Sequence, residues 1–174
     1  MAIPDLVGFL VGEKVRAAKL NEHTKGAIEA AVHYKPFVHI ANLNTFNAGV
    51  GNLAVPMDDL IDDTDSMTVG QTGGRVIVRT AGLYRVTAQV TYANASGGHR
   101  GINLYRNSSG PWVAPKVPAT PANVTTVQWT CTARFSVNET LSVNSETSVA
   151  CNNCPTGGPD GLAGSFLMME WVSK

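Results

Sequence analysis

Residues 83–92 read Leu-Tyr-Arg-Val-Thr-Ala-Gln-Val-Thr-Tyr, and this stretch decides the fold. Its side chains alternate: Tyr, Val, Ala, Val and Tyr fall on one face, and Arg, Thr, Gln and Thr fall on the other. Because successive side chains of a strand point to opposite sides of a sheet, this pattern predicts a half-buried antiparallel strand.

A second stretch alternates in the same way. Val127, Trp129, Cys131, Ala133 and Phe135 fall on one face of residues 127–135, with polar residues between them. Shorter strands are expected at 37–40, 53–56, 75–79, 101–106, 141–143 and 165–172. Residues 108–123, which contain four prolines, and residues 151–164 are expected to be loops. Short strands separated by turns predict a mainly β, antiparallel β-sandwich.

Charge is sparse and balanced. The 174 residues include 13 Lys and Arg against 13 Asp and Glu, so that only 15% are charged while 44% are hydrophobic. A net charge of zero argues against electrostatic capture of nucleic acid or of an anionic membrane. No apolar run approaches the roughly 20 residues that span a bilayer. Few charges suit a surface that is covered by other copies of the chain or by partners.

The N-terminal part differs in composition from the rest. Lysines stand at positions 14, 19, 25 and 35, and the next is Lys116. This shift, with the helix-breaking Pro36, divides the chain into an attachment segment, 1–36, and a head domain, 37–174. Residues 1–12 are expected to form an extended apolar arm and residues 14–34 one short helix. The expected partner contacts are the apolar side chains of this segment: Ile3, Leu6, Val7, Phe9, Leu10, Val11, Leu20 and Ile28.

Three segments resemble the tumour-necrosis-factor and complement-globular-head superfamily. Thr80-Ala-Gly-Leu-Tyr-Arg-Val-Thr-Ala-Gln-Val90 is similar to its turn and first core strand, with Gly82 making the turn and Tyr84 entering the core. Asn138-Glu-Thr-Leu-Ser-Val143 and Gly164-Ser-Phe-Leu-Met-Met169 resemble two later strands. The chain departs from the family at Leu83, where Tyr or Phe is usual, and at Asn138-Glu139, where Gly-Asp is usual. The resemblance implies a jelly roll that forms a homotrimer.

A second resemblance concerns tailed-bacteriophage virion proteins. Val11-Gly-Glu-Lys-Val-Arg-Ala-Ala-Lys-Leu-Asn21 and Asp63-Thr-Asp-Ser-Met67 are similar to segments seen in them. The resemblance implies an N-terminal segment bound to the particle and a trimeric head facing outward. We therefore expect a capsid decoration protein that binds the major capsid protein, is made in the bacterial cytoplasm and lies on the outer surface of the virion. The alternative is the tip of a tail or head fibre that binds a receptor or carbohydrate.

The strand aromatics have two interpretations. A buried aromatic side chain serves either the core of its own chain or a face packed on a three-fold axis. The core interpretation is favoured for Tyr84, Trp129 and Trp171. The full set consists of Tyr84, Tyr92, Trp129, Phe135, Phe166 and Trp171.

Two clusters raise the question of metal binding. The acids of residues 58–65 suit either a solvated loop or a calcium site, since calcium takes carboxylate oxygens. Cys151-Asn-Asn-Cys154 supplies two of the four ligands of a structural zinc site, which favours free thiols or a local disulfide over metal. No metal, cofactor or catalytic residues are predicted. An enzyme acting on capsule polysaccharide would need a pair of carboxylates in a cleft, and the dense acids here lie in one segment.

Overall fold

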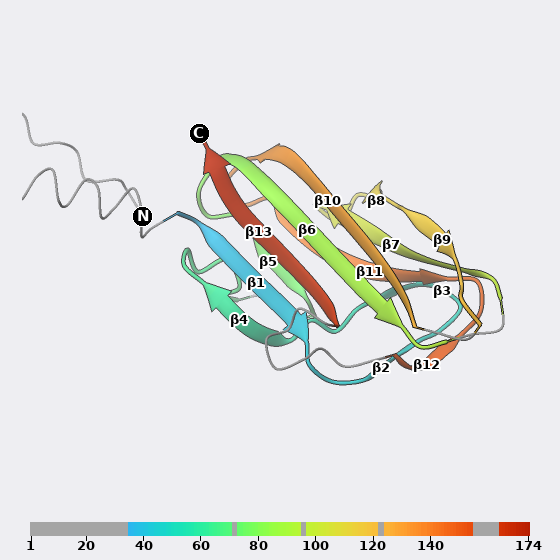
Figure 1. The fold of residues 1–174 in the computed structure, drawn as a ribbon. Coiled ribbons are helices and arrows are strands. Elements are labelled where there is room, and N and C mark those ends of the chain that lie inside the picture. The colour runs from blue at the N-terminus through green and yellow to red at the C-terminus, as the bar shows by residue number, and fades with distance from the viewer. Residues whose placement is uncertain (1–34, 71–72, 95–96, 122–123, 155–163) are drawn as a thin grey trace, which may run out of the picture.

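The computed structural model describes residues 35–70, 73–94, 97–121, 124–154 and 164–174, and all regular structure in them is β-strand. The strands, shown in Figure 1, are β1 (Phe37–Asn42), β2 (Phe46–Ala48), β3 (Gly51–Ala54), β4 (Asp59–Asp63), β5 (Arg75–Ile77), β6 (Gly82–Tyr92), β7 (His99–Arg106), β8 (Pro111–Val113), β9 (Lys116–Pro118), β10 (Thr125–Phe135), β11 (Thr140–Thr147), β12 (Cys151–Cys154) and β13 (Ser165–Ser173).

The strands form two facing sheets. The front sheet of Figure 1 has the order β10-β6-β13-β1-β4, and the back sheet has the order β3-β11-β7-β8, with β5 beside β11 and β9 beside β7. A small ribbon, β12-β2, lies at one end. All of these pairings are antiparallel. The expected mainly β antiparallel sandwich is confirmed.

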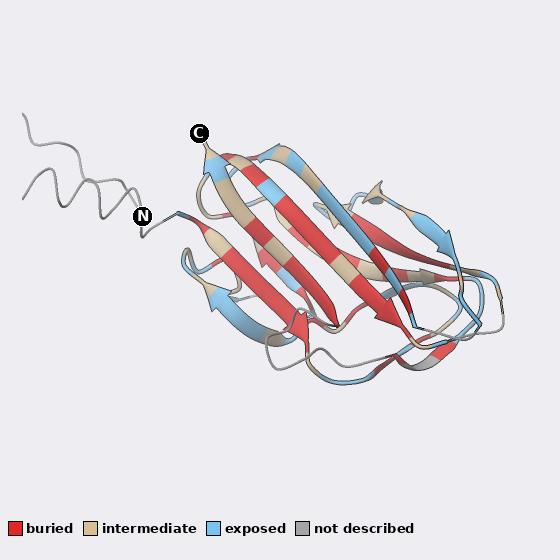
Figure 2. Cartoon of the chain, in the orientation of Figure 1, coloured by how far each residue is buried: buried red, intermediate tan, exposed pale blue. Residues whose placement is uncertain are grey.

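The core lies between the sheets. The inward residues of β6 are Tyr84, Val86, Ala88, Val90 and Tyr92, and each of them is 0% exposed. The back sheet contributes the buried side chains of Ile102, Leu104, Leu141 and Val143. Figure 2 shows the resulting run of buried residues along the central strands. The alternation that predicted β6 therefore corresponds to one face on the core and one on the opposite side of the sheet, where Thr87 and Thr91 are buried as well.

Several segments expected to be loops form short strands. Residues 59–63, within the acidic segment, form β4 and pair with β1. β8 and β9 both pair with β7, and β12 pairs with β2. In β8 and β9 the prolines stand at strand ends, Pro111 and Pro118, where a missing backbone donor is tolerated.

Two turn positions follow different steric rules. Asn138, where Gly is usual in the family that the sequence resembles, has φ 70°, a left-handed conformation that Asn tolerates better than most residues. Gly82, in contrast, does not have a positive φ; a Cβ there would lie 2.2 Å from Nε1 of Trp171 and 2.7 Å from the Ser173 carbonyl oxygen. Gly82 is therefore needed for the close approach of β13, and not for a turn as expected.

The predicted attachment segment falls on residues 1–34, which lie outside the described residues. The expected contacts at Ile3, Leu6, Val7, Phe9, Leu10, Val11, Leu20 and Ile28, and the expected helix at 14–34, lie there as well. The first described residues already belong to the sandwich. The Pro36 carbonyl accepts a hydrogen bond from the Trp171 backbone N–H at 2.9 Å, and β1 starts at Phe37. The division into 1–36 and 37–174 remains a prediction.

Candidate assembly interface

The outward side of the front sheet carries almost no charge at its centre. We call this surface the front face. It consists of Thr126, Gln128, Thr130 and Thr132 of β10, Thr87, Gln89 and Thr91 of β6, Phe166 and Met168 of β13, and His39 and Ala41 of β1. The β10 residues are exposed and Gln89 and Met168 partly exposed, whereas the others are buried already in the single chain. The strand registers place these residues in rows that cross the sheet.

Two rows define the centre of the front face. One row runs Gln128, Gln89, Phe166, Ala41, and the next runs Thr130, Thr87, Met168, His39. The four positions of each row on β10, β6, β13 and β1 contain no Asp, Glu, Lys or Arg, and each row ends in an aspartate on β4, Asp59 beside Ala41 and Asp62 beside His39. The threonine hydroxyls pair with each other across the strands, with 3.2 Å between the Oγ1 atoms of Thr87 and Thr130. A surface of hydroxyls, amides and apolar groups can be covered without burying an unpaired charge.

Charges lie at the borders of the front face. Arg85 and Glu170 form an ion pair at 3.3 Å with side chains 56% and 45% exposed. Asp59 and Asp62 stand on β4, at the edge of the sheet. An exposed ion pair contributes little to stability, so Arg85 and Glu170 mark where solvent reaches the face.

The outward side of the back sheet is different, because it carries a charged network. Glu146 accepts hydrogen bonds from Nζ of Lys116 at 3.1 Å and from Nδ2 of Asn103 at 3.0 Å, and lies 3.5 Å from Nε2 of His99. Burial raises the pKa of Glu146, but the hydrogen bonds from Lys116 and Asn103 outweigh it and hold the pKa below its ordinary value. A surface with such charges is suited to water, and the contrast singles out the front face for assembly.

Both edges of the front sheet expose apolar side chains. Trp129 is 38% exposed on β10 and Val124, just before it, is 55% exposed; on β4, Leu60 is 56% and Ile61 is 38% exposed. Figure 2 shows exposed residues along both edge strands and buried ones on the strands between them. Unpaired edges with apolar side chains are sites at which another chain can pack.

Trp129 was expected in the core and instead lies at the edge. β10 pairs with β6 on one side only, so Trp129, although it points the same way as the buried Val127, extends past the rim of the sandwich. Its indole N–H hydrogen-bonds the Cys131 thiol. Cys131 is half-buried, and its burial, which outweighs that hydrogen bond, raises its pKa.

The other predicted aromatics divide between the two surfaces. Tyr84, Tyr92 and Phe135 are buried between the sheets, where the rings of Tyr84 and Phe135 meet edge to face at 5.9 Å. Burial, with a smaller contribution from the Asp65 carboxylate, raises the pKa of Tyr84. Phe166 lies on the front face, 4% exposed, and meets the His39 ring at 5.5 Å. Trp171 is half-buried and packs against the core.

Two residues at one end of the core had not been singled out from the sequence. The Arg106 guanidinium lies 4.6 Å from the Phe135 ring and 5.9 Å from the Trp112 ring. The alternation of Ile102, Leu104 and Arg106 indicates that Arg106 faces inward. A charged residue is not expected among core positions, however, so the sequence alone does not single it out. Trp112 lies in the proline-containing segment expected to be a loop, where no periodicity marks it.

The acidic segment is organised by its own hydrogen bonds. Asp63 accepts from the backbone N–H groups of Met67 and Thr68, both at 2.8 Å, and from the Thr68 hydroxyl at 2.7 Å. Asp59 accepts from the Leu43 backbone N–H at 2.7 Å. Among the described residues no group of three or more His, Cys, Asp or Glu is placed to hold a metal ion. Asp63 therefore holds the turn after β4 together through these hydrogen bonds.

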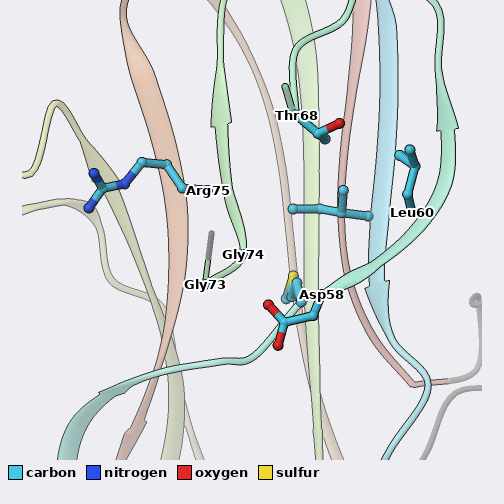
Figure 3. Close-up of a pocket in the computed structure, with 8 residues that line it drawn as sticks. Asp58, Leu60, Thr68, Gly73, Gly74 and Arg75 are labelled. Atoms are coloured by element: carbon cyan, nitrogen blue, oxygen red, sulfur yellow. The ribbon is translucent and has the colours of Figure 1, made fainter. Parts of the chain in front are cut away.

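An open hollow of about 350 Å³ lies beside β4 and β5. Figure 3 shows Asp58 and Arg75 in its lining, and Leu60 on β4. Arg75 also lines an adjoining hollow of about 320 Å³ with Tyr105. Asp58 is the one carboxylate among the described residues that line either hollow, so the pair that glycoside hydrolysis uses is not assembled here.

The fold has counterparts among solved structures. Murine APRIL at pH 5.0 is similar to this chain with a TM-score of 0.58 and 12% identity, over 79% of this chain and 99% of that one. Murine APRIL at pH 8.5 gives a TM-score of 0.54 and 14% identity over the same shares. The fold is a tumour-necrosis-factor-like jelly roll. No protein-family model and no curated protein sequence matches the chain.

The segments that resemble this jelly roll in sequence fall on its strands. Residues 80–90 lead into and form most of β6, residues 138–143 form a turn and the start of β11, and residues 164–169 lead into β13. β6 and β13 are neighbours in the front sheet, so two of the three segments build the face described above. No helix in the described part of the jelly roll is long and apolar enough to cross a membrane.

Proposed function

We propose that the jelly roll assembles as a homotrimer through its front face. The observation that carries this proposal is that the two central rows carry no charge on β10, β6, β13 and β1 and reach an aspartate only at the β4 edge, whereas the outward side of the back sheet is charged. Interface centres are depleted in charge and rich in aromatic residues and Met. On the front face Met168 is partly exposed, and Phe166 lies beneath the surface at 4% exposed.

The two edges support a ring and not a two-fold dimer. Each protomer offers one apolar edge at Trp129 and a different one at Leu60 and Ile61. A two-fold contact uses the same patch on both copies, whereas a cyclic contact joins two different patches. In the proposed trimer the β10 edge of one protomer packs beside the front face and β4 region of the next.

We propose further that this trimer is a structural protein of a tailed-bacteriophage particle, a capsid decoration protein held on the major capsid protein by residues 1–36. Support comes from the resemblance at residues 11–21 and 63–67 and from the composition shift near Pro36. The chain is then made in the bacterial cytoplasm and displayed on the outer surface of the virion. A fibre tip that binds a receptor or glycan is the second candidate, supported by the same resemblances.

Oligomeric state is the first test. Light scattering on the purified chain at micromolar concentration should give three times the chain mass. Thr130→Arg, at an exposed position on the edge strand β10 within one of the two central rows, should give a folded monomer because three buried arginines would repel one another. Leu53→Arg, at an exposed apolar position on the edge strand of the back sheet, is the matched control and should remain trimeric. A monomeric parent chain, or equal effects of both substitutions, would contradict the proposed interface.

Particle binding is the second test. Chain lacking residues 1–34 should lose binding to undecorated capsids while it remains folded and trimeric. Binding to tails with none to capsids would favour the fibre-tip candidate. Undiminished capsid binding by the shortened chain would place the attachment site on the jelly roll and overturn the role of residues 1–36.

A further inference from the structure

The two cysteines of β12 lie on the same side of their strand, which alternation alone would not allow. In the β12-β2 ribbon, Cys151 pairs with Ala48 and Cys154 pairs with Phe46, so the chain advances three residues on β12 and two on β2. This irregularity is a β-bulge, and a bulge re-aims the side chains that follow it. Cys151 and Cys154 are therefore both turned inward, 2% and 0% exposed.

The two thiols are in contact. The Cys154 thiol donates to the Cys151 carbonyl oxygen at 3.5 Å, and the two sulfur groups also hydrogen-bond each other. Burial, and then the hydrogen bond with Cys151, raise the pKa of Cys154 to about 12. In the structure both cysteines are free.

A buried cation holds the chain just before the pair. Arg100 is 0% exposed, its guanidinium lies 5.7 Å from the Tyr92 ring, and it donates to the Val149 carbonyl at 2.7 Å, two residues before Cys151. Its Nε and Nη2 atoms have no hydrogen-bond partner among the described residues. Arg100 therefore fixes the entry of the chain into β12.

We propose that Cys151 and Cys154 are a reversible disulfide site that closes when the chain meets a low-molecular-weight disulfide. The Cys151 thiol loses its proton, and its thiolate attacks one sulfur of the small disulfide, whose S–S bond breaks and releases one small thiolate. The Cys154 sulfur then gives up its proton and attacks the Cys151 sulfur of this mixed disulfide, whose S–S bond breaks; the two small thiolates released in the two steps take up the two protein protons and leave as thiols. Two protein thiols are oxidised, and one small disulfide is reduced to two thiols.

Under the proposed function, the cysteine pair changes from thiols to a disulfide and not back. A chain made in a reducing cytoplasm and later displayed outside the cell passes from thiol to disulfide once. This consequence rests on the proposed function, whereas the disulfide chemistry does not, because it involves one chain only.

The test is a thiol–disulfide equilibrium. Full-length chain carrying Cys131→Ser, which removes the half-buried third thiol, is equilibrated in buffers of oxidised and reduced glutathione, once in native buffer and once in urea. Acid quenching and intact mass then give the fraction of chain that has lost two hydrogens. Because folding holds the two sulfurs together, the equilibrium constant for ring closure should be at least about tenfold larger in native buffer than in urea. Because glutathione reaches the buried thiols of the folded chain slowly, the chain is also refolded directly in the same buffers, which gives the native equilibrium sooner.

The control is Cys154→Ser in the same background. It leaves Cys151 without a resolving thiol, so the chain should accumulate a glutathione adduct where the parent accumulates a ring. An equilibrium constant no larger in native buffer than in urea would overturn the proposal. A parent chain that accumulates the glutathione adduct and does not close the ring would also overturn the proposal. Both results are independent of the oligomeric state and of particle binding.

Discussion

Glu139 accepts two hydrogen bonds from one guanidinium, that of Arg106, from Nε at 3.0 Å and from Nη2 at 2.6 Å. The same carboxylate accepts from the Ser136 backbone N–H at 2.6 Å, and Arg106 also donates to the Arg134 carbonyl at 2.8 Å. The pair therefore joins the end of β7 to the end of β10 and the turn that follows. It also holds the Arg106 guanidinium over the Phe135 ring.

Glu139→Gln should destabilise the jelly roll at neutral pH. The hydrogen bond with Arg106, the largest cause, holds the pKa of Glu139 below its ordinary value of 4.5. A lowered pKa in the folded state means that the stabilisation is present above the ordinary pKa and is lost as pH falls through the folded value. Loss of charge-assisted hydrogen bonds costs about 1–3 kcal/mol at pH 7, and the difference from the parent chain should shrink below the ordinary pKa. Urea unfolding between pH 7 and pH 3 measures it.

Glu170→Gln is the control for this prediction. Its ion pair with Arg85 is exposed, so the free energy of unfolding should hardly change at any pH. If the two substitutions had the same pH profile, the hydrogen bonds of Glu139 would not account for the effect.

Gly82→Ala should destabilise the chain far more than Gly49→Ala. A Cβ at Gly82 meets the rigid Trp171 ring and a backbone oxygen, while a Cβ at Gly49 meets only Cδ1 of Leu53 at 2.9 Å, the end of a partly exposed side chain that can move. Overpacking that moves backbone costs about 1–3 kcal/mol. Thermal unfolding of both variants checks the difference, and a stable Gly82→Ala chain would mean that β13 lies farther from β6 than described.

Tyr84→Ala and Trp129→Ala should separate folding from assembly. Tyr84 is 0% exposed, so its truncation should lower the free energy of unfolding by about 3–5 kcal/mol. Trp129 is 38% exposed on an edge strand, so its truncation should cost less in a monomer but shift the trimer toward monomer at low concentration. Urea unfolding and sedimentation on each variant give the two quantities. If both substitutions lowered the free energy of unfolding equally, Trp129 would be a core residue and not an edge residue.

Asp63→Ala should loosen the turn after β4, whereas calcium should have no effect. The substitution leaves the Met67 and Thr68 backbone N–H groups without their acceptor, at a cost of about 1–3 kcal/mol. The midpoint of thermal unfolding of the parent chain should be the same with millimolar calcium and with chelator. A rise with calcium that disappears in Asp63→Ala would show that the carboxylates bind the ion.

The sequence predicted best where burial imposes a period. In β6 each second side chain from Tyr84 to Tyr92 is buried, and this period of two is visible without a structure. At Trp129, alternation tells which way the side chain points but not whether a facing strand lies opposite it. That depends on the order of strands in the sheet, which leaves β10 at an edge.

Short strands were missed because a few residues cannot display a period. β12 and β2 are held by each other and by a bulge, and the contact between Cys151 and Cys154 results from that bulge. The front face was missed for a related reason. Its rows combine residues from β10, β6, β13 and β1 that are distant along the chain, so only the pairing registers bring them together.

Arg100 and Arg106 are on the same inward side of β7, one near Tyr92 and one near Phe135, with the core side chains Ile102 and Leu104 between them. This spacing fixes the register of β7 against β11. If β7 slipped by one residue against β11, both guanidinium groups would turn to solvent, and Asn103 would enter the apolar interior. If it slipped by two, one cation would move off its ring into the hydrocarbon centre, where nothing could pair it. Two cations six positions apart thus exclude the neighbouring registers on both sides, and they select one alignment for the strand in the middle of the back sheet.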